Sequence, residues 1–406
     1  MKMAHLIFLI VALFLIGGFV FMKFNIALSI FILAILTGIF KRIPLGEFFL
    51  LFYRTLTHFD TINMILVIVI VTYLAELLKV SGFLDDVTNL FKSIFPPRVY
   101  LPAFSMIIGL LPMPGGALVS APMVEEGATY TDLKEEEKAL LNFWFRHVWE
   151  PISPLYPEFL LGVSILGTTI GKVISIQWPV TFGMFLSGVI FILPKINSKE
   201  YEMKEKLSSL VLWKSIKTLS PILFIFAILL TFKHLPSFVA MLSGVIYIII
   251  FKKVTISNLL ASFKWKKILE YAFLIYAIFL LREIISSTQF ASHLYTELKA
   301  LSIPYFLTLF LLPFSIGFLA GISSASIGIA YPLLMPLLKK NGVINGANLL
   351  IAYMGVWTAL LFTPTHLCLS LSVDYFKAKF PDFYRLLLLP YILLLLVNLM
   401  WVLVLR

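Results

Sequence analysis

The sequence contains little charge and almost no cysteine, and both shortages exclude whole classes of protein. Only 13% of its 406 residues are charged, against 60% that are hydrophobic, and the mean hydropathy is +1.00. A soluble domain of this length does not need so much apolar surface. The single cysteine, Cys368, excludes a disulfide framework and a zinc site built from cysteines. The chain has no glycine-rich phosphate loop followed by Lys and Ser or Thr, which argues against an ATP-driven pump.

Long apolar segments fill the chain instead. Roughly 17 to 25 apolar residues cross a hydrocarbon core of ~30 Å, and this length is met near 6–22, 24–40, 62–78, 177–193, 236–251 and 386–405. The first segment lacks a cleavage site of small residues, so we interpret it as a retained helix. The sequence therefore predicts an all-α polytopic membrane protein. Basic loops on one side of the membrane explain its net charge of +11 better than nucleic-acid binding does.

Two stretches 208 residues apart carry the same landmarks. Gly109-Leu-Leu-Pro-Met-Pro-Gly-Gly116 lies 33 residues ahead of Trp149, and Gly317-Phe-Leu-Ala-Gly-Ile-Ser-Ser324 lies 33 residues ahead of Trp357. We therefore predict two diverged copies of one unit, at 1–194 and 218–406, joined by a polar linker at 195–217. Corresponding interruptions of apolar segments in two copies are the best sequence indication of a transporter's binding site.

Each copy is predicted to hold five crossings and one hairpin that enters and leaves the membrane on the same side. The crossings fall near 5–22, 24–40, 61–78, 139–170 and 176–193, then near 218–232, 236–251, 267–282, 347–376 and 386–405, and the re-entrant hairpins near 99–124 and 304–338. Because five is odd, the second copy is inverted relative to the first.

Amphipathic pieces near 43–58, 83–95, 255–266 and 286–300 are expected along the interface. Lys and Arg number 20 on one side and 10 on the other, which predicts both termini outside and the linker in the cytoplasm.

Four interrupted segments supply the candidate binding site. Non-helical backbone at membrane depth persists only where protein buries it or where it lines a wet cavity. The two hairpin tips contribute Gly115 and Gly116, then Ser323, Ser324 and Ser326. The two broken crossings, near 139–170 and 347–376, contribute Asn142, Arg146, His147, Glu150 and Ser153, then Thr363, Thr365 and His366. The alternative for the small residues is close packing of helices.

The first broken crossing also carries ionisable residues, which are costly at depth and mark a functional site by default. Glu150 follows Arg146 by four residues and His147 by three, so in a helix its carboxylate reaches both. Two interpretations stay open. Arg146 and Glu150 form a structural pair, or Arg146 attracts an anionic group while His147 or Glu150 exchanges a proton. No metal site is predicted, because His147, Glu150 and His366 lack a further ligand at an informative spacing.

The segments Leu111-Pro-Met-Pro-Gly-Gly-Ala-Leu-Val-Ser-Ala-Pro122 and Trp144-Phe-Arg-His-Val-Trp-Glu150 carry a family resemblance. With the repeated architecture, they resemble the ion-transporter superfamily, which includes citrate and dicarboxylate symporters, gluconate and lactate permeases and arsenite antiporters. Within it, the chain is similar to a largely uncharacterised prokaryotic integral-membrane family. The resemblance implies an outer scaffold, a transport domain with elevator-like motion, and homodimers. Dicarboxylate symporters carry Ser-Asn-Thr at both tips, which this chain lacks, so two symmetric sodium sites are not implied.

The sequence thus predicts a secondary active transporter in the prokaryotic plasma membrane, and not an enzyme. Its partners are membrane lipid and a small-molecule or inorganic anion, with organic carboxylates favoured and nucleic acid excluded. No cofactor is expected beyond H⁺ or Na⁺ as coupling ion. One alternative is a cation/proton antiporter that uses Glu150 and Glu76. Another is an intramembrane metal-dependent enzyme that acts on lipid or peptide through His147, Glu150 and His366.

Overall fold

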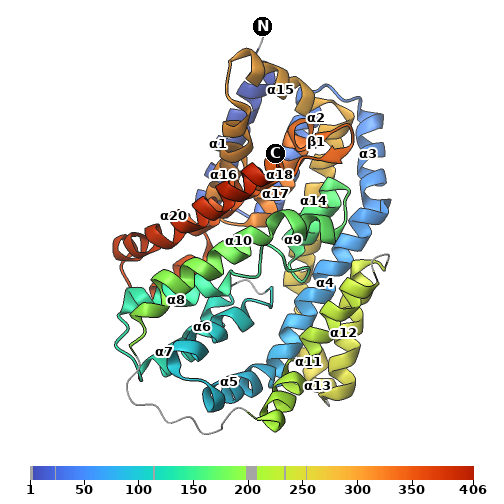
Figure 1. The fold of residues 1–406 in the computed structure, drawn as a ribbon. Coiled ribbons are helices and arrows are strands. Elements are labelled where there is room, and N and C mark those ends of the chain that lie inside the picture. The colour runs from blue at the N-terminus through green and yellow to red at the C-terminus, as the bar shows by residue number, and fades with distance from the viewer. Residues whose placement is uncertain (1–2, 23, 113–114, 198–207, 233–234, 253) are drawn as a thin grey trace.

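A computed structural model describes residues 3–22, 24–112, 115–197, 208–232, 235–252 and 254–406 of the chain (Figure 1). Part of the first predicted hairpin tip (113–114) and part of the predicted linker (198–207) lie outside the described residues. The described residues are mostly helical. Their one sheet is a ribbon formed by β1 (Lys339–Lys340) and β2 (Val343–Ile344). The fold of this part of the chain is therefore all-α, as predicted.

Two runs of ten α-helices follow one another in the described chain. The first run is α1 (Ala4–Phe21), α2 (Ile26–Phe40), α3 (Leu45–Thr57), α4 (Phe59–Val80), α5 (Phe83–Ile94), α6 (Pro97–Ile108), α7 (Ala117–Ala128), α8 (Glu135–Arg146), α9 (Pro157–Leu166) and α10 (Ile170–Phe191), followed by the short 3₁₀ turn η1 (Leu193–Lys195). The second run is α11 (Ser209–Thr231), α12 (Ser237–Phe251), α13 (Ile256–Ala261), α14 (Trp265–Ser287), α15 (Phe290–Ala300), α16 (Tyr305–Ala320), α17 (Ser323–Leu338), α18 (Gly346–Phe362), α19 (Leu367–Tyr375) and α20 (Phe380–Val404). In both runs the fourth helix is long, and the sixth and seventh pack together as a helix–turn–helix pair.

Local sequence signals set many of the helix ends. The Asn25 side chain accepts a hydrogen bond from the Ala27 backbone N–H at 2.8 Å, and Asn345 accepts one from Asn348 at 3.0 Å. These caps satisfy donors that the first helical turn leaves without a partner. The helices α9 and α16 end at Gly167 and Gly321, which have φ of +54° and +72°. Glycine adopts this left-handed backbone without steric cost, so it can stop a helix sharply.

Six helical segments in the described chain are long and apolar enough to cross a membrane. They are Ala4–Phe21, Phe59–Val80, Ile170–Lys195, Ser209–Leu229, Gly346–Tyr375 and Phe380–Val404. The predicted crossings 24–40 and 236–251 fall on α2 and α12, whose 15 residues each span only about 22 Å. The predicted crossing 267–282 falls on α14, which is not among the six and carries charged residues toward both ends. The chain is a multi-pass membrane protein, and its count of ten crossings stays a prediction.

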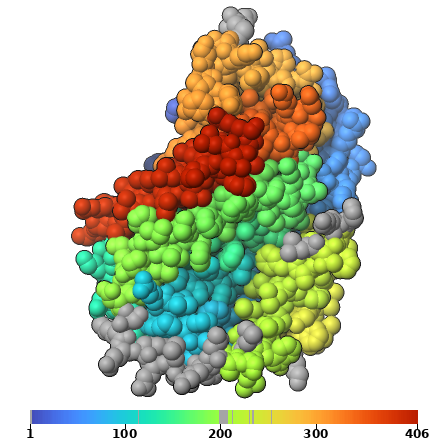
Figure 2. Space-filling view, viewed as in Figure 1, coloured from blue at the N-terminus to red at the C-terminus, as the bar shows by residue number. Residues whose placement is uncertain are grey.

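Helices of the two runs pack against one another in exchanged pairs. The helix α2 packs on α14, and its counterpart α12 packs on α4. In the same way α9 packs on α17 while α7 packs on α19. The corresponding helices α10 and α20 lie side by side (Figures 1 and 2). The packing therefore brings interrupted segments that lie far apart in sequence into one region.

One local prediction was wrong. The helix α8 ends at Arg146, so Arg146, His147 and Glu150 do not share the helical spacing assumed above. The residue before a proline avoids helical backbone, and Pro151 follows Glu150, so the helix stops before it reaches the proline. The amphipathic piece expected at 255–266 is helical over the six residues of α13 and at Trp265 and Lys266, where α14 begins.

Candidate functional site

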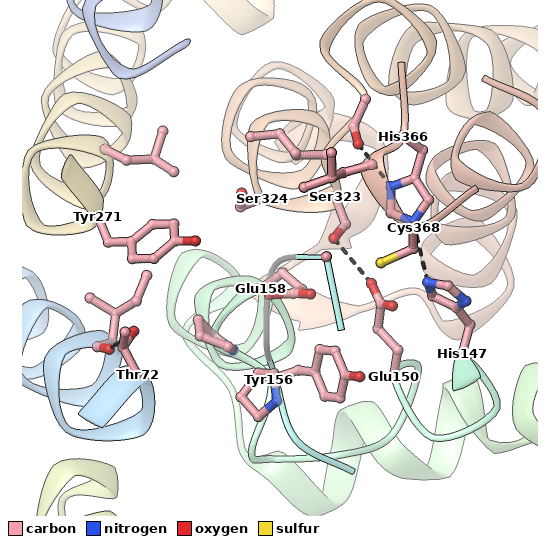
Figure 3. Close-up of a pocket in the computed structure, with 18 of the residues that line it drawn as sticks. Thr72, His147, Glu150, Tyr156, Glu158, Tyr271, Ser323, Ser324, His366 and Cys368 are labelled. Carbon is pink, nitrogen blue, oxygen red and sulfur yellow. Dashed lines mark hydrogen bonds between the residues drawn. The ribbon is translucent and has the colours of Figure 1, made fainter. Parts of the chain in front are cut away.

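A cavity of ≈ 220 Å³ lies where the interrupted segments of both halves meet (Figure 3). One wall comes from the long helices, with Ile68 and Thr72 of α4 and Tyr271, Leu274 and Ile275 of α14. The rest of its lining comes from the interrupted segments of both halves: Pro112, Gly115, Arg146, His147, Glu150, Tyr156, Pro157, Glu158, Gly321, Ile322, Ser323, Ser324, Thr365, His366, Leu367 and Cys368. Thr72 and Tyr271 face these residues from the opposite side in Figure 3.

Four helices begin at this cavity, two in each half. Gly115 precedes α7, and Pro157 and Glu158 begin α9. Ser323 and Ser324 begin α17, and Leu367 and Cys368 begin α19. The first turn of a helix carries backbone N–H groups without helical partners and a partial positive charge. The backbone therefore makes this cavity favourable for negative charge.

The guanidinium group of Arg146 reaches the start of α7. Arg146 is the last residue of α8 and is only 2% exposed. A Cβ atom added to Gly116 would overlap the Arg146 guanidinium, and one added to Gly109 would overlap the Arg146 carbonyl oxygen. Both glycines are therefore required by close approach of Arg146, in contrast to Gly115, whose φ of +67° itself favours glycine.

Glu150 and Glu158 bring two carboxyl groups to the cavity. Glu150 is 5% exposed, and its Oε1 atom accepts a hydrogen bond from the Ser323 hydroxyl at 3.2 Å. The Glu158 carboxyl lies beside it (Figure 3). The segment between the two residues is held by Tyr156, whose hydroxyl donates a hydrogen bond to the Gly109 carbonyl at 2.5 Å. This hydrogen bond ties the segment between the two acids to Gly109, which caps the C-terminus of α6.

Two histidines, one from each half, meet at the other side of Glu150. The Nε2 atoms of His147 and His366 are 3.2 Å apart. The Nδ1 atom of His147 lies 2.6 Å from the Phe143 carbonyl oxygen, and that of His366 lies 3.0 Å from the Gly321 carbonyl oxygen. Cys368 lies next to both rings, with its sulfur and the ring nitrogens all within 4.8 Å of one another (Figure 3).

Eight of the thirteen residues proposed from the sequence line this cavity. They are Gly115, Arg146, His147, Glu150, Ser323, Ser324, Thr365 and His366. The other five, Gly116, Asn142, Ser153, Ser326 and Thr363, lie behind the lining. Asn142 is fully buried, with its amide hydrogen-bonded to the Ala117 carbonyl and to the Ser372 hydroxyl at 3.1 and 3.0 Å.

The hydroxyl groups behind the lining bind backbone carbonyls or amides. Ser326 donates to the Pro313 carbonyl at 2.7 Å, and Thr363 donates to the Phe318 carbonyl at 2.6 Å. Ser153 accepts from the Leu155 backbone N–H at 3.3 Å. These contacts hold the interrupted segments in place. Some small polar residues at the helix breaks thus line the cavity, and others bind backbone groups behind it. Their spacing in the sequence did not tell these two groups apart.

Thr72, Tyr271 and Cys368 were not proposed from the sequence. Thr72 and Tyr271 lie in the middle and first part of long helices, with no local interruption to mark them. Cys368 carried one usable signal, since it follows His366 by two residues just after a predicted break. Glu76, which the antiporter alternative invoked, is not part of the lining, and its carboxylate lies 3.9 Å from the Lys267 ammonium.

The fold is similar to that of a solved membrane transporter. The crystal structure of the YdaH transporter of Alcanivorax borkumensis, described as having an unusual topology, aligns with 89% of this chain and 87% of its own chain. The TM-score is 0.62 and the sequence identity is 16%, so the likeness concerns the fold. None of the curated proteins with which the chain was compared matches it. A family model described as "Protein of unknown function (DUF401)" matches residues 3–405, and the chain belongs to that family.

Proposed function

We propose that the protein is a secondary active transporter that moves a small, anionic, carboxylate-like solute across the prokaryotic plasma membrane. The observation that carries this proposal is the convergence of four helix N-termini around the cavity that Arg146 lines. Broken helices whose N-termini point at a substrate carboxylate are a recurring device of transporters. A guanidinium adds a charge that persists at every relevant pH and a planar fork that matches a carboxylate.

The size of the cavity favours a small solute. Its volume of ≈ 220 Å³ is below the roughly 300–1,000 Å³ of pockets that hold drug-sized ligands. Ile68, Leu274 and Ile275 supply apolar surface on the wall formed by α4 and α14. A short carboxylate with a small apolar body matches both features.

The paired carboxyl groups provide a way to couple solute to protons. With Glu150 and Glu158 both ionised, the formal charges of Arg146 and the two acids sum to −1, which disfavours an anion. One proton on the pair brings the sum to 0, and two bring it to +1. Proton binding and anion binding therefore favour each other, and this coupling is reciprocal. We accordingly favour H⁺ over Na⁺ as the coupling ion.

The arrangement of helices supports alternating access by an elevator-type motion. The helices α4 and α14 contribute one wall of the cavity, and the hairpins and broken helices contribute the rest. Sliding of the hairpin-bearing body along α4 and α14 would expose the cavity to each side in turn.

The ordered correspondence of two helix runs and their exchanged packing support an inverted repeat, and with it membership of the ion-transporter superfamily. The fold likeness to a transporter supports transport over catalysis.

The test uses purified protein in proteoliposomes. A thermal-shift screen of organic and inorganic anions, with and without sodium, selects a solute. Solute counterflow and uptake driven by a pH gradient are then measured for the wild type and for Glu150→Gln and Glu158→Gln. We expect at least one of these variants to keep counterflow and to lose pH-driven accumulation. Accumulation by both variants at the wild-type level would refute proton coupling through this pair.

The cation/proton antiporter is the second candidate, because two carboxyl groups line the cavity. It predicts proton movement driven by a cation gradient with no added solute. The contact of Glu76 with Lys267 weakens the part of that hypothesis that used Glu76 as a carrier. Cation-driven proton flux without solute, together with no anion that stabilises the protein, would favour the antiporter.

A further inference from the structure

The imidazole rings of His147 and His366 are oriented by backbone carbonyls. A carbonyl oxygen only accepts hydrogen bonds, so Nδ1 of each ring must carry the hydrogen that it donates to Phe143 or Gly321. In the neutral ring, Nε2 then holds the lone pair. Both Nε2 atoms point at each other over 3.2 Å, and two facing lone pairs repel unless a proton or a metal ion lies between them.

The distance between these atoms matches two ligands of one tetrahedral ion. Two imidazole nitrogens bound at about 2.05 Å with a tetrahedral angle are about 3.3 Å apart. The sulfur of Cys368 completes a set of three ligand atoms that lie within 4.8 Å of one another. Histidine ligands of metals characteristically donate Nδ1–H to a carbonyl or carboxylate, which fixes the ring and its tautomer, and both rings do so here.

We propose that His147, His366 and Cys368 bind a thiophilic transition-metal cation of the Zn²⁺ type. Two imidazoles and one thiolate suit Zn²⁺ and exclude Mg²⁺ and Ca²⁺, which require oxygen ligands. His147 is 2% exposed and Cys368 is 5% exposed, so little solvent competes for the ion. Because His147 belongs to one half of the chain and the other two ligands to the other half, the ion would join the two broken helices.

Three protein ligands leave one coordination position open, as in zinc sites that hold a water molecule or a substrate. All three residues line the cavity, so the open position faces the space assigned to the solute. There it would accept an oxygen of an anionic solute, beside Arg146. This role of the ion rests on the proposed transport function, whereas the metal site itself does not.

The metal site is tested on purified full-length protein, freed of metal by a chelator and then titrated with ZnCl₂ alone. We expect one Zn²⁺ per chain. X-ray absorption at the zinc edge should show nitrogen ligands at about 2.0–2.1 Å and one sulfur at about 2.3 Å. Titration with CoCl₂ should produce a sulfur-to-cobalt charge-transfer band. No stoichiometric uptake by the wild type, or a zinc shell without sulfur, would overturn the proposal.

Two ligand variants and one control complete the test. Cys368→Ser should lose the charge-transfer band, and Cys368→Ser and His366→Ala should each weaken Zn²⁺ binding at least tenfold. The control is His58→Ala, since the His58 side chain is 62% exposed and is not part of the cavity lining. It should bind as the wild type does. Equal zinc affinity in all four proteins would show that the ion binds elsewhere.

Transport is measured separately on the same preparations, with and without chelator. One equivalent of zinc bound to a protein that moves no anion would leave the metal site intact and refute the proposed function. Proton-coupled anion uptake by protein that takes up no zinc would refute the metal site and leave the proposed function intact.

Discussion

The hydroxyl of Ser323 donates a hydrogen bond to the Glu150 carboxylate, with 3.2 Å between Oγ and Oε1, although 173 residues separate them in the chain. Ser323 is the first residue of α17, and Glu150 lies in the break between α8 and α9. A buried carboxylate is stable only with such donors, because burial removes it from water. This contact therefore joins the second hairpin to the first broken helix at the cavity.

Ser323→Ala should weaken uptake of the selected solute by roughly ten- to 100-fold. Loss of a hydrogen bond to a charged group costs about 1.5–3 kcal/mol, and about 1.4 kcal/mol corresponds to a factor of ten. Ser187→Ala is the matched control, because Ser187 is a buried helical serine of α10 outside the cavity lining. Both variants are compared by uptake in proteoliposomes and by thermal unfolding. Wild-type uptake by Ser323→Ala would contradict a role for this contact.

Gly116→Ala should abolish uptake while the protein still reaches the membrane. The backbone of Gly116 is right-handed helical, with φ −55° and ψ −17°, so alanine is allowed there. The added methyl group, however, would occupy the position of the Arg146 guanidinium and displace it. Gly171→Ala is the control, since nothing lies within 4 Å of a Cβ atom at that position of α10. Normal uptake by Gly116→Ala would show that the position of Arg146 is not critical.

The sequence predicted the breaks of this fold better than its contacts. Proline and glycine act on their own backbone, so the interruptions after Arg146 and Phe362 could be located from local rules. The spacing of Arg146 and Glu150 led to a wrong prediction that they lie on one face of a helix, because α8 ends between the two residues. The neighbours of Glu150 could not be predicted from spacing, since Ser323 and Cys368 reach it only through the packing of distant helices. The position of Asn142 behind the lining could not be predicted for the same reason, because its partner Ser372 lies 230 residues away.

Cysteine labelling tests the predicted orientation, with both termini outside. Asn197 lies in the predicted cytoplasmic linker (195–217), and Val343 lies in the β1–β2 ribbon on the predicted outer side. Both residues are exposed. A membrane-impermeant thiol reagent should label Val343→Cys in intact cells and Asn197→Cys only after permeabilisation. The wild type is the background control, since its single cysteine is buried. Labelling of Asn197→Cys alone in intact cells would show that the linker lies outside, opposite to the predicted orientation.

Glu297 should give the protein a stability that depends on pH. Burial by itself would raise the pKa of the Glu297 carboxyl, but hydrogen bonds from the His5 side chain and from the backbone N–H groups of Leu6 and His5 lower its pKa below the ordinary value of 4.5. A lowered pKa in the folded state stabilises the fold above the unfolded-state pKa, and this stabilisation is lost as the pH falls through the folded-state pKa.

Glu297→Gln should therefore lower Tm at neutral pH, where the carboxylate is ionised. The difference from the wild type should shrink as the pH falls below 4.5 and through the lowered pKa of the folded state. The matched control is Glu47→Gln, because Glu47 is exposed on α3 and should change Tm little at any pH. Tm is measured across the pH series in detergent. A difference in Tm between Glu297→Gln and the wild type that stays constant down to acid pH would contradict this account.

Arg146 and Glu150 allow a test that separates a structural pair from a binding site. Arg146→Met alone leaves Glu150 buried near Glu158 without the guanidinium, which should destabilise the protein by about 3–5 kcal/mol. Adding Glu150→Gln removes the excess negative charge, so the double variant should recover most of that stability. Uptake should nevertheless stay absent, because the cavity has lost the cation that we assign to the anionic solute. Thermal unfolding and solute counterflow on the same preparations measure the two effects independently. A double variant that both folds and accumulates solute would reduce Arg146 and Glu150 to a structural pair and transfer the binding role to the helix N-termini at Ser323 and Cys368.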